Sequence, residues 1–262
     1  MDRNIYSFDA ATTTEALIQW TRDYFDAAGA GTNAILGMSG GKDSTVSAAI
    51  LAKALGPERV IGVCMPQGSQ SLNEADKICE KLGIRSFVVN VGKACQGLQE
   101  AIADAGAELI NASVQNIPPR VRMTTLYAIG QTFNARVVNT CNLSEDYIGY
   151  ATKFGDGAGD FSLLAGLTVT EVLAIGDYLG VPYEWVHKTP DDGLPHSCPD
   201  EEKIGFTYAE LDIYIRTGKA PEGYVHGNEA EGLKVDKIDR MRRANLHKLL
   251  PMPKFDPELP LK

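Results

Sequence analysis

Residues 39–44 combine two glycines, two serines, a lysine and an aspartate, a set of side chains that suits phosphate binding. The segment reads Ser-Gly-Gly-Lys-Asp-Ser, and it lies between an apolar run and a helix-forming run. Glycine lets the backbone turn sharply and approach a ligand closely. The N–H groups of the first helical turn and the helix dipole favour an anion at that place. The pattern therefore predicts a phosphate-binding loop between a strand and a helix.

This segment differs from the Walker A loop, G-x-x-x-x-G-K-[ST], at two positions. Leu36 stands where the first glycine would be, and Asp43 follows the lysine where serine or threonine would be. An acidic side chain beside phosphate groups needs a divalent cation between them, and Mg²⁺ accepts carboxylate oxygen as a ligand. We therefore predict that Asp43 binds magnesium. The alternative is a Gly/Ser turn that binds no ligand.

Residues 142–160 form a second concentration of acidic residues and glycines, with one lysine. They follow the apolar segment Ala135–Thr140, which we predict to be a strand. Taken alone, residues 142–160 could equally be a surface loop with turn glycines. Their position after a strand makes them a second candidate for the binding site.

The elements that must position these loops follow from an alternation of apolar and helical segments along the chain. The predicted strands are Ala34–Met38, Val60–Met65, Ser86–Val91 and Ala135–Thr140. The first predicted helix is opened by a capping box at Thr12 and Glu15. The other predicted helices are Thr45–Leu55, Asn73–Leu82, Gly97–Ala105, one from Pro118-Pro119 to Phe133, and Thr170–Leu179. The last of these leads into the apolar segment Tyr183–Val186. Apolar strands separated by helices indicate a doubly wound α/β fold, a parallel sheet with helices on both faces. Its ligands bind beyond the carboxyl ends of the strands.

The composition is that of a globular protein of 262 residues, 44% hydrophobic and 23% charged. We expect one domain over residues 1–262, which is long enough to bury a substantial core. The formal net charge of −9 argues against nucleic acid as a partner, because nucleic acid would favour a basic face. The C-terminal segment 234–255 is locally basic. Its charges could lie on a solvated helix face or could supply cations to a phosphorylated substrate.

Cysteine usage and apolar patterning indicate the cytoplasm. The five cysteines are scattered and include no C-x-x-C pair, which is typical of a reducing compartment and not of a disulfide framework or a zinc site. No apolar run has the length of a membrane span, and the first residues lack the order of a signal peptide. Residues 188–205 contain three prolines and few large apolar side chains. We predict that they form a mobile lid over the nucleotide site, with disorder as the alternative.

Several motifs resemble those of one protein family. The S-G-G-x-D-S loop is similar to the pyrophosphate loop of the N-type ATP pyrophosphatases. The segment from Asn142 to Asp160 resembles the N-S-E-D-x-x-G-Y-x-T-K-x-G-D-G motif of the NAD synthetases within that group. Residues 116–123, which end in Arg-Val-Arg-Met, and residues 247–251, which begin with His-Lys, resemble two further segments of that family. The resemblance covers nearly the whole chain, and the fold it implies is of the adenine-nucleotide α-hydrolase type.

The resemblance implies three groups of site residues. The residues implied for ATP are Gly37, Met38, Ser39, Gly40, Gly41, Lys42, Asp43, Ser44 and Thr140. The residues implied for magnesium are Asp43 and Glu145, two carboxylates on strand-end loops. The residues implied for deamido-NAD are Arg120, Lys153, Asp160, His247 and Lys248. In the family the last two reach across a homodimer interface, so the resemblance also implies a homodimer.

Two positions depart from the family pattern on the ATP side. Val169 stands where the family usually has a lysine or arginine near the phosphates, and Asp191 stands where it usually has serine or threonine. One cation is lost and one anion is gained, and a charge-assisted contact is worth roughly 1.5–3 kcal/mol. We therefore expect weaker ATP binding unless Lys42 or Lys188 compensates.

The activity that the resemblance implies is the ATP-dependent amidation of deamido-NAD in NAD biosynthesis, through an acyl-adenylate, with release of pyrophosphate and AMP. The protein would be a carbon–nitrogen ligase in which no side chain acts as a nucleophile. We expect ammonia to be the nitrogen donor, because these residues hold no glutaminase domain and none of the cysteines lies in a Cys–His–Glu amidotransferase pattern. Two alternatives stay open: another N-type ATP pyrophosphatase with a different acceptor, such as a tRNA base, and a nucleotide-binding homologue with a weakened ATP site.

Overall fold

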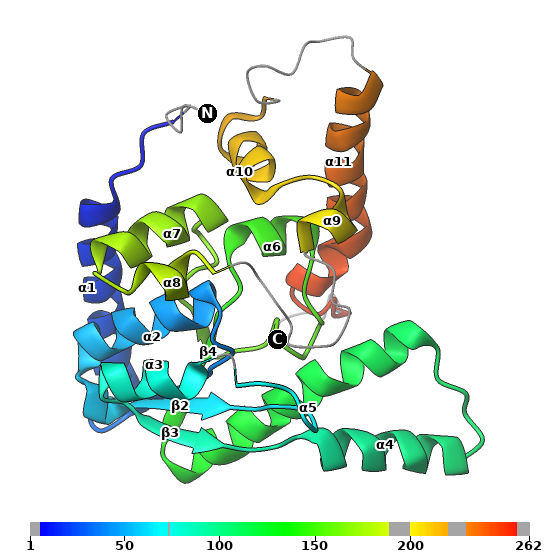
Figure 1. The fold of residues 1–262 in the computed structure, drawn as a ribbon, viewed down its shortest axis with the longest axis horizontal. Coiled ribbons are helices and arrows are strands. Elements are labelled where there is room, and N and C mark those ends of the chain that lie inside the picture. The colour runs from blue at the N-terminus through cyan, green and yellow to red at the C-terminus, as the bar shows by residue number, and fades with distance from the viewer. Residues whose placement is uncertain (1–5, 73, 189–199, 220–228, 256–262) are drawn as a thin grey trace, which may run out of the picture.

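The computed structural model describes residues 6–72, 74–188, 200–219 and 229–255, and it contains a five-stranded parallel sheet in the order β3-β2-β1-β4-β5 (Figure 1). The strands are β1 Asn33–Gly37, β2 Val60–Cys64, β3 Arg85–Val88, β4 Ala135–Asn139 and β5 Phe161–Ser162. In the centre of the sheet Ile35 of β1 pairs with Ile61 of β2 on one side and with Val137 of β4 on the other. The order places the ends of β1 and β4 side by side, and both predicted loops follow these ends.

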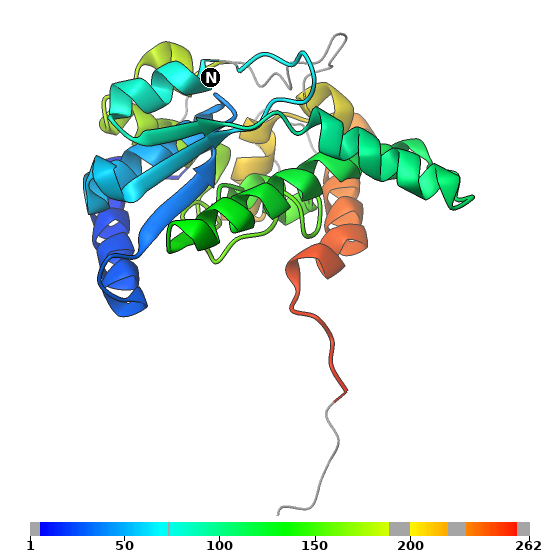
Figure 2. The ribbon, with the colours of Figure 1, turned by 90° about the horizontal axis from the view of Figure 1, so that it is seen from below.

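Helices cover both faces of the sheet because alternate side chains of the strands pack in two separate apolar clusters. Ala34 and Leu36 lie in the first cluster, whereas Ile35 between them lies in the second. The helices packed on the first face are α1 Ala10–Ala28, α2 Lys42–Leu55, α3 Ala75–Leu82, α7 Val169–Tyr178 and α8 Tyr183–Val186. The helices on the second face are α4 Gly92–Asp104 and α5 Asn111–Thr132, drawn in green in Figures 1 and 2. The predicted doubly wound α/β fold is confirmed.

A third apolar cluster is formed by α7 together with helices outside the two layers that flank the sheet. Those helices are α6 Leu143–Ile148, α9 Asp200–Ile204, α10 Tyr208–Thr217 and α11 Glu229–Leu249. Figure 1 shows α10 and α11 on the far side of α6 from the sheet. This cluster positions the basic C-terminal segment. Among the described helices none is both long and apolar enough to cross a membrane.

Several element boundaries differ from the sequence prediction. Helix α1 begins before the predicted capping box, because the side chain of Asp9 accepts a hydrogen bond from the N–H of Thr12 and caps the helix. Helix α5 begins before Pro118 and Pro119 and continues through them. The apolar segment Tyr183–Val186 is a short helix.

Two structured segments lie where loops were expected. Part of residues 142–160 forms helix α6, which Asn142 caps, and strand β5 follows it. Within the predicted lid 188–205, residues Asp200–Ile204 form helix α9. Residues 189–199 lie outside the described part of the chain, so the predicted mobility of the lid stays a prediction.

Candidate active site

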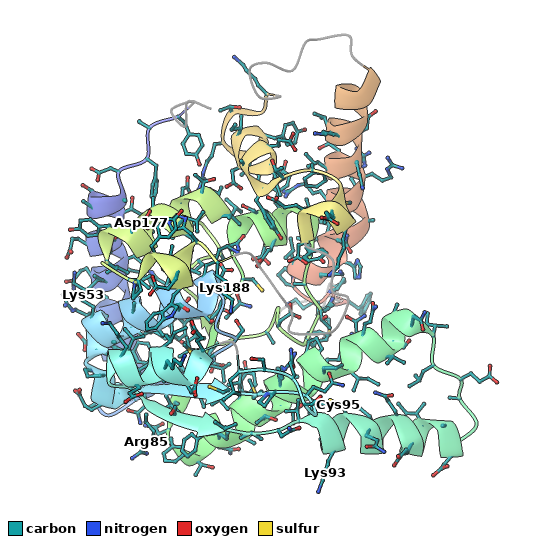
Figure 3. The ribbon with its side chains drawn as sticks, in the orientation of Figure 1. Lys53, Arg85, Lys93, Cys95, Asp177 and Lys188 are labelled. Atoms are coloured by element: carbon teal, nitrogen blue, oxygen red, sulfur yellow. The ribbon has the colours of Figure 1, made fainter. Side chains whose placement is uncertain are left out.

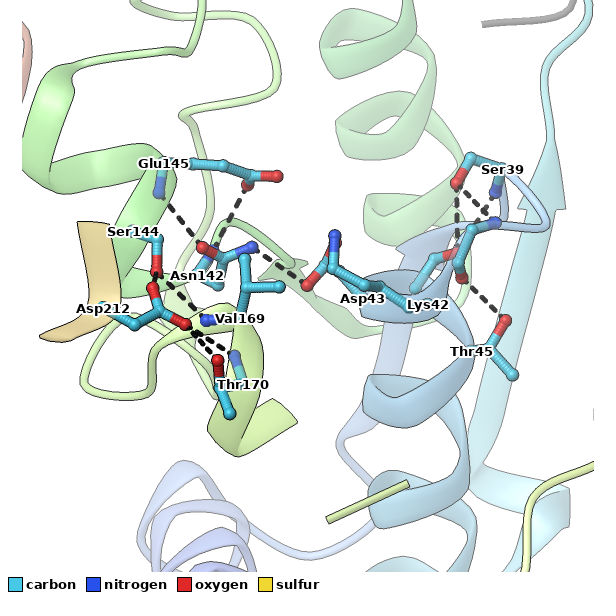
Figure 4. Close-up of polar contacts among 12 residues, drawn as sticks. Ser39, Lys42, Asp43, Thr45, Asn142, Ser144, Glu145, Val169, Thr170 and Asp212 are labelled. Carbon is cyan, nitrogen blue, oxygen red and sulfur yellow. Dashed lines mark hydrogen bonds and ion pairs between the residues drawn. The ribbon is translucent and has the colours of Figure 1, made fainter. Parts of the chain in front are cut away.

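The phosphate loop is a tight turn between β1 and α2 in which two serine hydroxyls face each other. Gly40 has φ 76°, a left-handed conformation that glycine adopts without strain. The Oγ atoms of Ser39 and Ser44 lie 3.1 Å apart, and the N–H of Gly41 donates to Ser39 Oγ over 3.2 Å. The hydroxyl of Thr45 donates to the carbonyl of Gly41 over 2.8 Å (Figure 4). Gly41, the N-cap of α2, supplies no side-chain cap, so the first backbone N–H groups of the helix favour an anion at this place.

Asn142 joins the two strand-end loops. Its Nδ2 donates to Asp43 Oδ1 over 3.0 Å, and its Oδ1 accepts from the N–H of Glu145 over 3.0 Å. The N–H of Asn142 in turn donates to Glu145 Oε2 over 3.4 Å. Figure 4 shows this chain of contacts from α2 across to α6. One buried amide thus holds the two predicted metal ligands on the same side of the site, as the sequence analysis expected of neighbouring strand ends.

The two carboxylates share their surroundings with one buried cation. Lys42 Nζ lies 2.8 Å from Asp43 Oδ2, and Lys42 is only 8% exposed. Burial by itself would lower the pKa of Lys42, but the charges of Asp43 and Glu145 raise it above its usual value. Desolvation and the charge of Asp43 raise the pKa of Glu145 to about 8, against the opposing effect of Lys42. Lys42 alone does not offset two carboxylates, so Glu145 binds a proton near neutral pH, and a further cation would take the place of that proton.

The residues present fit magnesium if ATP and water complete its coordination. Among the described residues no group of three or more acidic, histidine or cysteine side chains is gathered as a metal site. The protein would therefore supply the carboxylates of Asp43 and Glu145 alone. Mg²⁺ usually keeps several waters and binds through one or two carboxylates together with substrate phosphates. Such a set agrees with a phosphate loop beside two carboxylates.

A cavity of about 480 Å³ opens between the phosphate loop, the end of β4 and helix α5. The predicted residues that line it are Gly37, Met38, Ser39, Gly40, Gly41, Lys42, Asp43, Thr140 and Glu145. Ser44 is buried behind the loop. Three cations that the site prediction omitted also line the cavity: Arg122, Lys203 and Lys188, which follows α8 (Figure 3).

Arg122 lines the cavity, whereas Arg120, predicted to bind deamido-NAD, does not line it. Residues two positions apart in a helix point to different sides, so only one of these arginines can face inward. Arg122 Nε donates to the carbonyl of Met65 over 3.0 Å, and its guanidinium also donates to Gln70. The Arg-Val-Arg sequence could not say which arginine lines the cavity, and the deamido-NAD role predicted for Arg120 stays a prediction.

Four of the five residues predicted to bind deamido-NAD lie together, and one lies apart. Arg120 Nε donates to the carbonyl of Lys153, and Lys153 Nζ donates to the carbonyl of His247 over 2.6 Å. Lys248 Nζ donates to the carbonyl of Gly149 over 2.8 Å. These contacts bring the end of α11 against the segment after α6. None of the four residues lines the described cavity, and their cluster is a separate polar surface.

Asp160 is the residue that lies apart. Its Oδ2 accepts a hydrogen bond from the N–H of Val137 over 2.7 Å, and its Oδ1 accepts a longer one from the hydroxyl of Tyr127. The N–H of Asp160 donates to the carbonyl of Val137 over 2.7 Å. These bonds fasten the start of β5 to β4. The binding role predicted for Asp160 stays a prediction. In the structure its hydrogen bonds with Val137 connect two strands of the sheet.

A buried polar network that the sequence analysis missed supports the site from behind. Asp212 of α10 is 1% exposed and accepts hydrogen bonds from Ser144 Oγ and from the N–H and hydroxyl of Thr170 (Figure 4). Ser144 precedes Glu145 in α6. Glu171 of α7 is buried as well and pairs with Arg216 of α10. The network ties α6, α7 and α10 together, and only their tertiary contact reveals it.

The two departures from the family pattern can be compared with this geometry. Val169 is 7% exposed, its side chain packs in the third apolar cluster, and its N–H donates to Ser144 Oγ over 3.0 Å. It lies at the first turn of α7, near Asp43 and Asn142 in Figure 4. Asp191 lies outside the described residues. The buried cation next to Asp43 is Lys42, one of the two lysines expected to compensate for Val169.

Known proteins resemble this chain over nearly its whole length. The sequence pattern of the NAD synthase family matches residues 13–252. The NH(3)-dependent NAD(+) synthetase of Carboxydothermus hydrogenoformans is 37% identical over 251 residues, which cover 95% of this chain and 96% of that protein. The NMN synthetase of Francisella tularensis has a similar structure, with a TM-score of 0.82 and 27% identity over 97% of this chain and 100% of that one. The NAD+ synthetase of Burkholderia pseudomallei gives a TM-score of 0.72 and 27% identity over 92% and 91% of the two chains.

Proposed function

Because the chain belongs to the NAD synthase family, we propose that it is an ammonia-dependent NAD synthetase, an ATP-dependent ligase that amidates deamido-NAD. The geometric observation that supports this function most directly is the position of Asn142, which joins Asp43 of the phosphate loop to Glu145 at one wall of the cavity. Neither alternative from the sequence, an acceptor such as a tRNA base or a non-catalytic homologue, is favoured by these relatives.

We assign the ATP phosphates to the first turn of α2. The residues that would contact ATP are those of the loop and the end of β4: Gly37, Met38, Ser39, Gly40, Gly41, Lys42, Asp43, Ser44 and Thr140. Asp43 and Glu145 would hold magnesium, whose charge would offset that of the triphosphate when bound. Lys42 and Arg122 add two buried or half-buried cations beside it. This arrangement positions an anionic co-substrate and neutralises it without any covalent contribution from a side chain.

The reaction itself then depends on positioning. The nicotinic-acid carboxylate of deamido-NAD attacks the α-phosphorus of ATP, and pyrophosphate leaves. Ammonia attacks the carbonyl carbon of the acyl-adenylate, AMP leaves with the bonding electrons, and the nitrogen loses a proton. Water competes with ammonia for the same carbonyl, so the enzyme must hold the two substrates close and exclude water. Residues 188–205, the predicted lid, would perform this exclusion, and this role stays a prediction because residues 189–199 lie outside the described part of the chain.

Deamido-NAD would be bound by Arg120, Lys153, Asp160, His247 and Lys248, and we propose that the protein is a homodimer. Lys153 contacts the carbonyl of His247 within one chain, which supports a common binding surface for these two residues. The reach of His247 and Lys248 across a dimer interface stays a prediction. Exposed apolar side chains at the end of α11, including Leu249 and Leu250, support an interface there. Sedimentation tests the dimer, and a monomer that binds deamido-NAD tightly would rule out a site completed by the partner.

The name of one structural relative, an NMN synthetase, favours a second acceptor for comparison, the mononucleotide. The decisive assay measures pyrophosphate release from ATP with ammonia and magnesium, using deamido-NAD or nicotinic acid mononucleotide as the acceptor. We expect release with deamido-NAD, accompanied by formation of NAD. Release with the mononucleotide alone would assign the chain to the second acceptor, and release with neither would contradict the proposed function.

A further inference from the structure

Position 169 leaves the cavity without a cation that the family pattern provides. Val169 is 7% exposed, and its side chain packs in the third apolar cluster. A replacement must line the cavity and must carry a charge that no other group already holds in place. Among the described residues that line the cavity, the cations are Lys42, Arg122, Lys188 and Lys203.

Two of these cations are held by other groups. Lys42 Nζ lies 2.8 Å from Asp43 Oδ2 and the lysine is buried, so its charge offsets that carboxylate first. Arg122 Nε donates to the carbonyl of Met65 over 3.0 Å, which holds the guanidinium at the end of β2. Both cations therefore have fixed positions, and neither can take the place of a cation at the start of α7.

Lys203 of α9 is held only loosely. Its side chain is 42% exposed, and its Nζ lies 3.6 Å from Asp200 Oδ1, which is longer than a good hydrogen bond between nitrogen and oxygen. Asp200 Oδ1 also accepts a hydrogen bond from the hydroxyl of Tyr150 over 2.9 Å. An ammonium has three N–H donors, so Lys203 can bind an acceptor in the cavity while Asp200 keeps the hydrogen bond from Tyr150.

Helix α9 brings this lysine close to the phosphate loop and to the residue that lacks a cation. Burial lowers the pKa of Lys42, but the neighbouring carboxylates raise it above its usual value, and Asp200 is one of them. The charge of Asp200 therefore acts on the phosphate loop, and the Nζ of Lys203 lies beside that charge. Ile204, the next residue of α9, packs in the same apolar cluster as Val169. A cation on α9 can thus replace one at the start of α7.

Lys188, the remaining cation of the lining, lies near a different acid. The pKa of Glu74 is lowered mainly by Lys77, and the charge of Lys188 adds to that effect. Part of the charge of Lys188 is therefore directed toward the start of α3. Lys203 is the better placed of the two lysines.

We propose that Lys203 is a phosphate-binding residue, whose ammonium donates to the triphosphate of magnesium-bound ATP and supplies the cation that position 169 lacks. The assignment rests on the proposed function, since it takes ATP as the co-substrate. It extends the ATP site from the loop at α2 to helix α9.

The test compares Lys203→Met and Lys203→Arg with the matched variant Lys77→Met. Lys77 also pairs with an acid three residues before it, Glu74, with 3.1 Å between Nζ and Oε1, but it does not line the cavity. Lys188→Met is included as the rival lysine. Calorimetry measures the dissociation constants of MgATP and of magnesium pyrophosphate for each protein, and the melting temperature of each free protein is recorded.

Lys203→Met is expected to weaken the binding of MgATP and of magnesium pyrophosphate by a similar factor, roughly 5- to 20-fold. That factor lies at the low end for a charge-assisted hydrogen bond, because the side chain is partly exposed. Lys203→Arg, which keeps the charge, should stay within about threefold of the parent. Lys77→Met and Lys188→Met should bind both ligands within about twofold of the parent. Added sodium chloride should reduce the difference between the parent and Lys203→Met, since salt screens exposed charges. The melting temperatures of all variants should stay within about 2 °C, because exposed ion pairs contribute little to stability.

Four outcomes would overturn the assignment. Unchanged MgATP binding in Lys203→Met would mean that the ammonium does not touch the phosphates. A loss in Lys188→Met alone would give the role to that lysine, and an equal loss in Lys77→Met would reduce the effect to the net charge of the protein. A loss of MgATP binding without a loss of pyrophosphate binding would place Lys203 at the nucleoside. If the parent itself binds neither ligand, the proposed function is at fault, and the assignment fails with it.

Discussion

The proposed phosphate side of the site and the proposed dinucleotide side, here called the phosphate side and the dinucleotide side, are built by different kinds of contact. On the phosphate side, neighbouring residues of one turn bond to each other, and the ends of two adjacent strands bring Asp43 and Glu145 to one buried asparagine. On the dinucleotide side, side chains bond to backbone carbonyls across 94 and 99 residues of sequence, as in the contacts of Lys153 and Lys248. The order of the strands fixes the first side. The packing of α11 fixes the second.

This difference predicts that substitutions on the two sides change different properties of the protein. Substitutions on the phosphate side change charge at a place whose backbone is already held by the sheet, so they should alter turnover and leave the fold intact. Substitutions on the dinucleotide side change how well α11 is attached. They should alter the affinity for deamido-NAD with little effect on ATP.

The largest effect is expected from Asp43→Asn and Glu145→Gln. An amide is nearly isosteric with a carboxylate but is a poor magnesium ligand, so kcat should fall by about 1,000-fold, equivalent to about 4 kcal/mol, if each carboxylate stabilises the developing charge. Melting temperatures should stay close to that of the parent. The control is Asp146→Asn, which alters the neighbouring acid outside the cavity lining and should keep near-parental activity. Near-normal turnover of Asp43→Asn or Glu145→Gln, with magnesium as the sole metal, would remove that carboxylate from the metal site.

A smaller but still large effect is expected from Arg216→Ala, measured as stability. Glu171 is 3% exposed, and removal of Arg216 leaves its carboxylate buried without its partner, at a cost of about 3 kcal/mol. Urea unfolding measures the loss. The surface pair of Lys53 and Glu15 serves as the control, since Lys53→Ala should cost less than about 1 kcal/mol. A selective rise in the KM for deamido-NAD would show that this network serves the dinucleotide side and would break the comparison.

Lys153→Met tests the dinucleotide side directly. It removes the ammonium that contacts the carbonyl of His247 and keeps most of the aliphatic chain. The KM for deamido-NAD should rise roughly tenfold, while the KM for ATP stays unchanged. Lys153→Arg, which keeps the charge, should recover part of the affinity. Equal increases in both KM values would mean that Lys153 supports the whole site and not one side.

The sequence allowed the phosphate side to be predicted in more detail than the dinucleotide side. A Gly-Gly turn between an apolar run and a helix-forming run contains its own signal, and parallel strands bring their carboxyl ends to one edge. The loop and Asp43 could therefore be named before the fold was known, whereas Glu145 was named from the family resemblance. Residues 39–43 and Glu145 line one cavity. The fold class followed from the same alternation.

Contacts that depend on tertiary packing could not be predicted in this way. The choice between Arg120 and Arg122 depends on how α5 is rotated against the sheet, and the buried Asp212 is visible only when α10 packs on α6 and α7. The two prolines within α5 gave a misleading local signal. Proline removes a helical hydrogen bond, but residues Val114 and Gln115, whose carbonyls lose their donors, are partly or fully exposed, so water can replace them.

The smallest effect is expected from Asn245→Ala, which loosens α11 without touching a charged group. Asn245 Nδ2 donates to the carbonyl of Ile148 over 3.1 Å, and Gly149, with φ 66°, lets the two segments approach: a Cβ there would lie 2.1 Å from that of Asn245. Loss of the hydrogen bond should lower the free energy of unfolding by about 1 kcal/mol.

Because His247 and Lys248 follow Asn245 in α11, the KM for deamido-NAD should rise about two- to threefold if part of that energy positions them. The KM for ATP should not change, since the phosphate loop is held by the sheet and not by α11. Gln96→Ala, which removes an exposed amide contact on α4, provides a control that should alter neither KM. If Asn245→Ala raises both KM values equally, α11 supports the phosphate side as much as the dinucleotide side, and the division between strand order and helix docking does not hold.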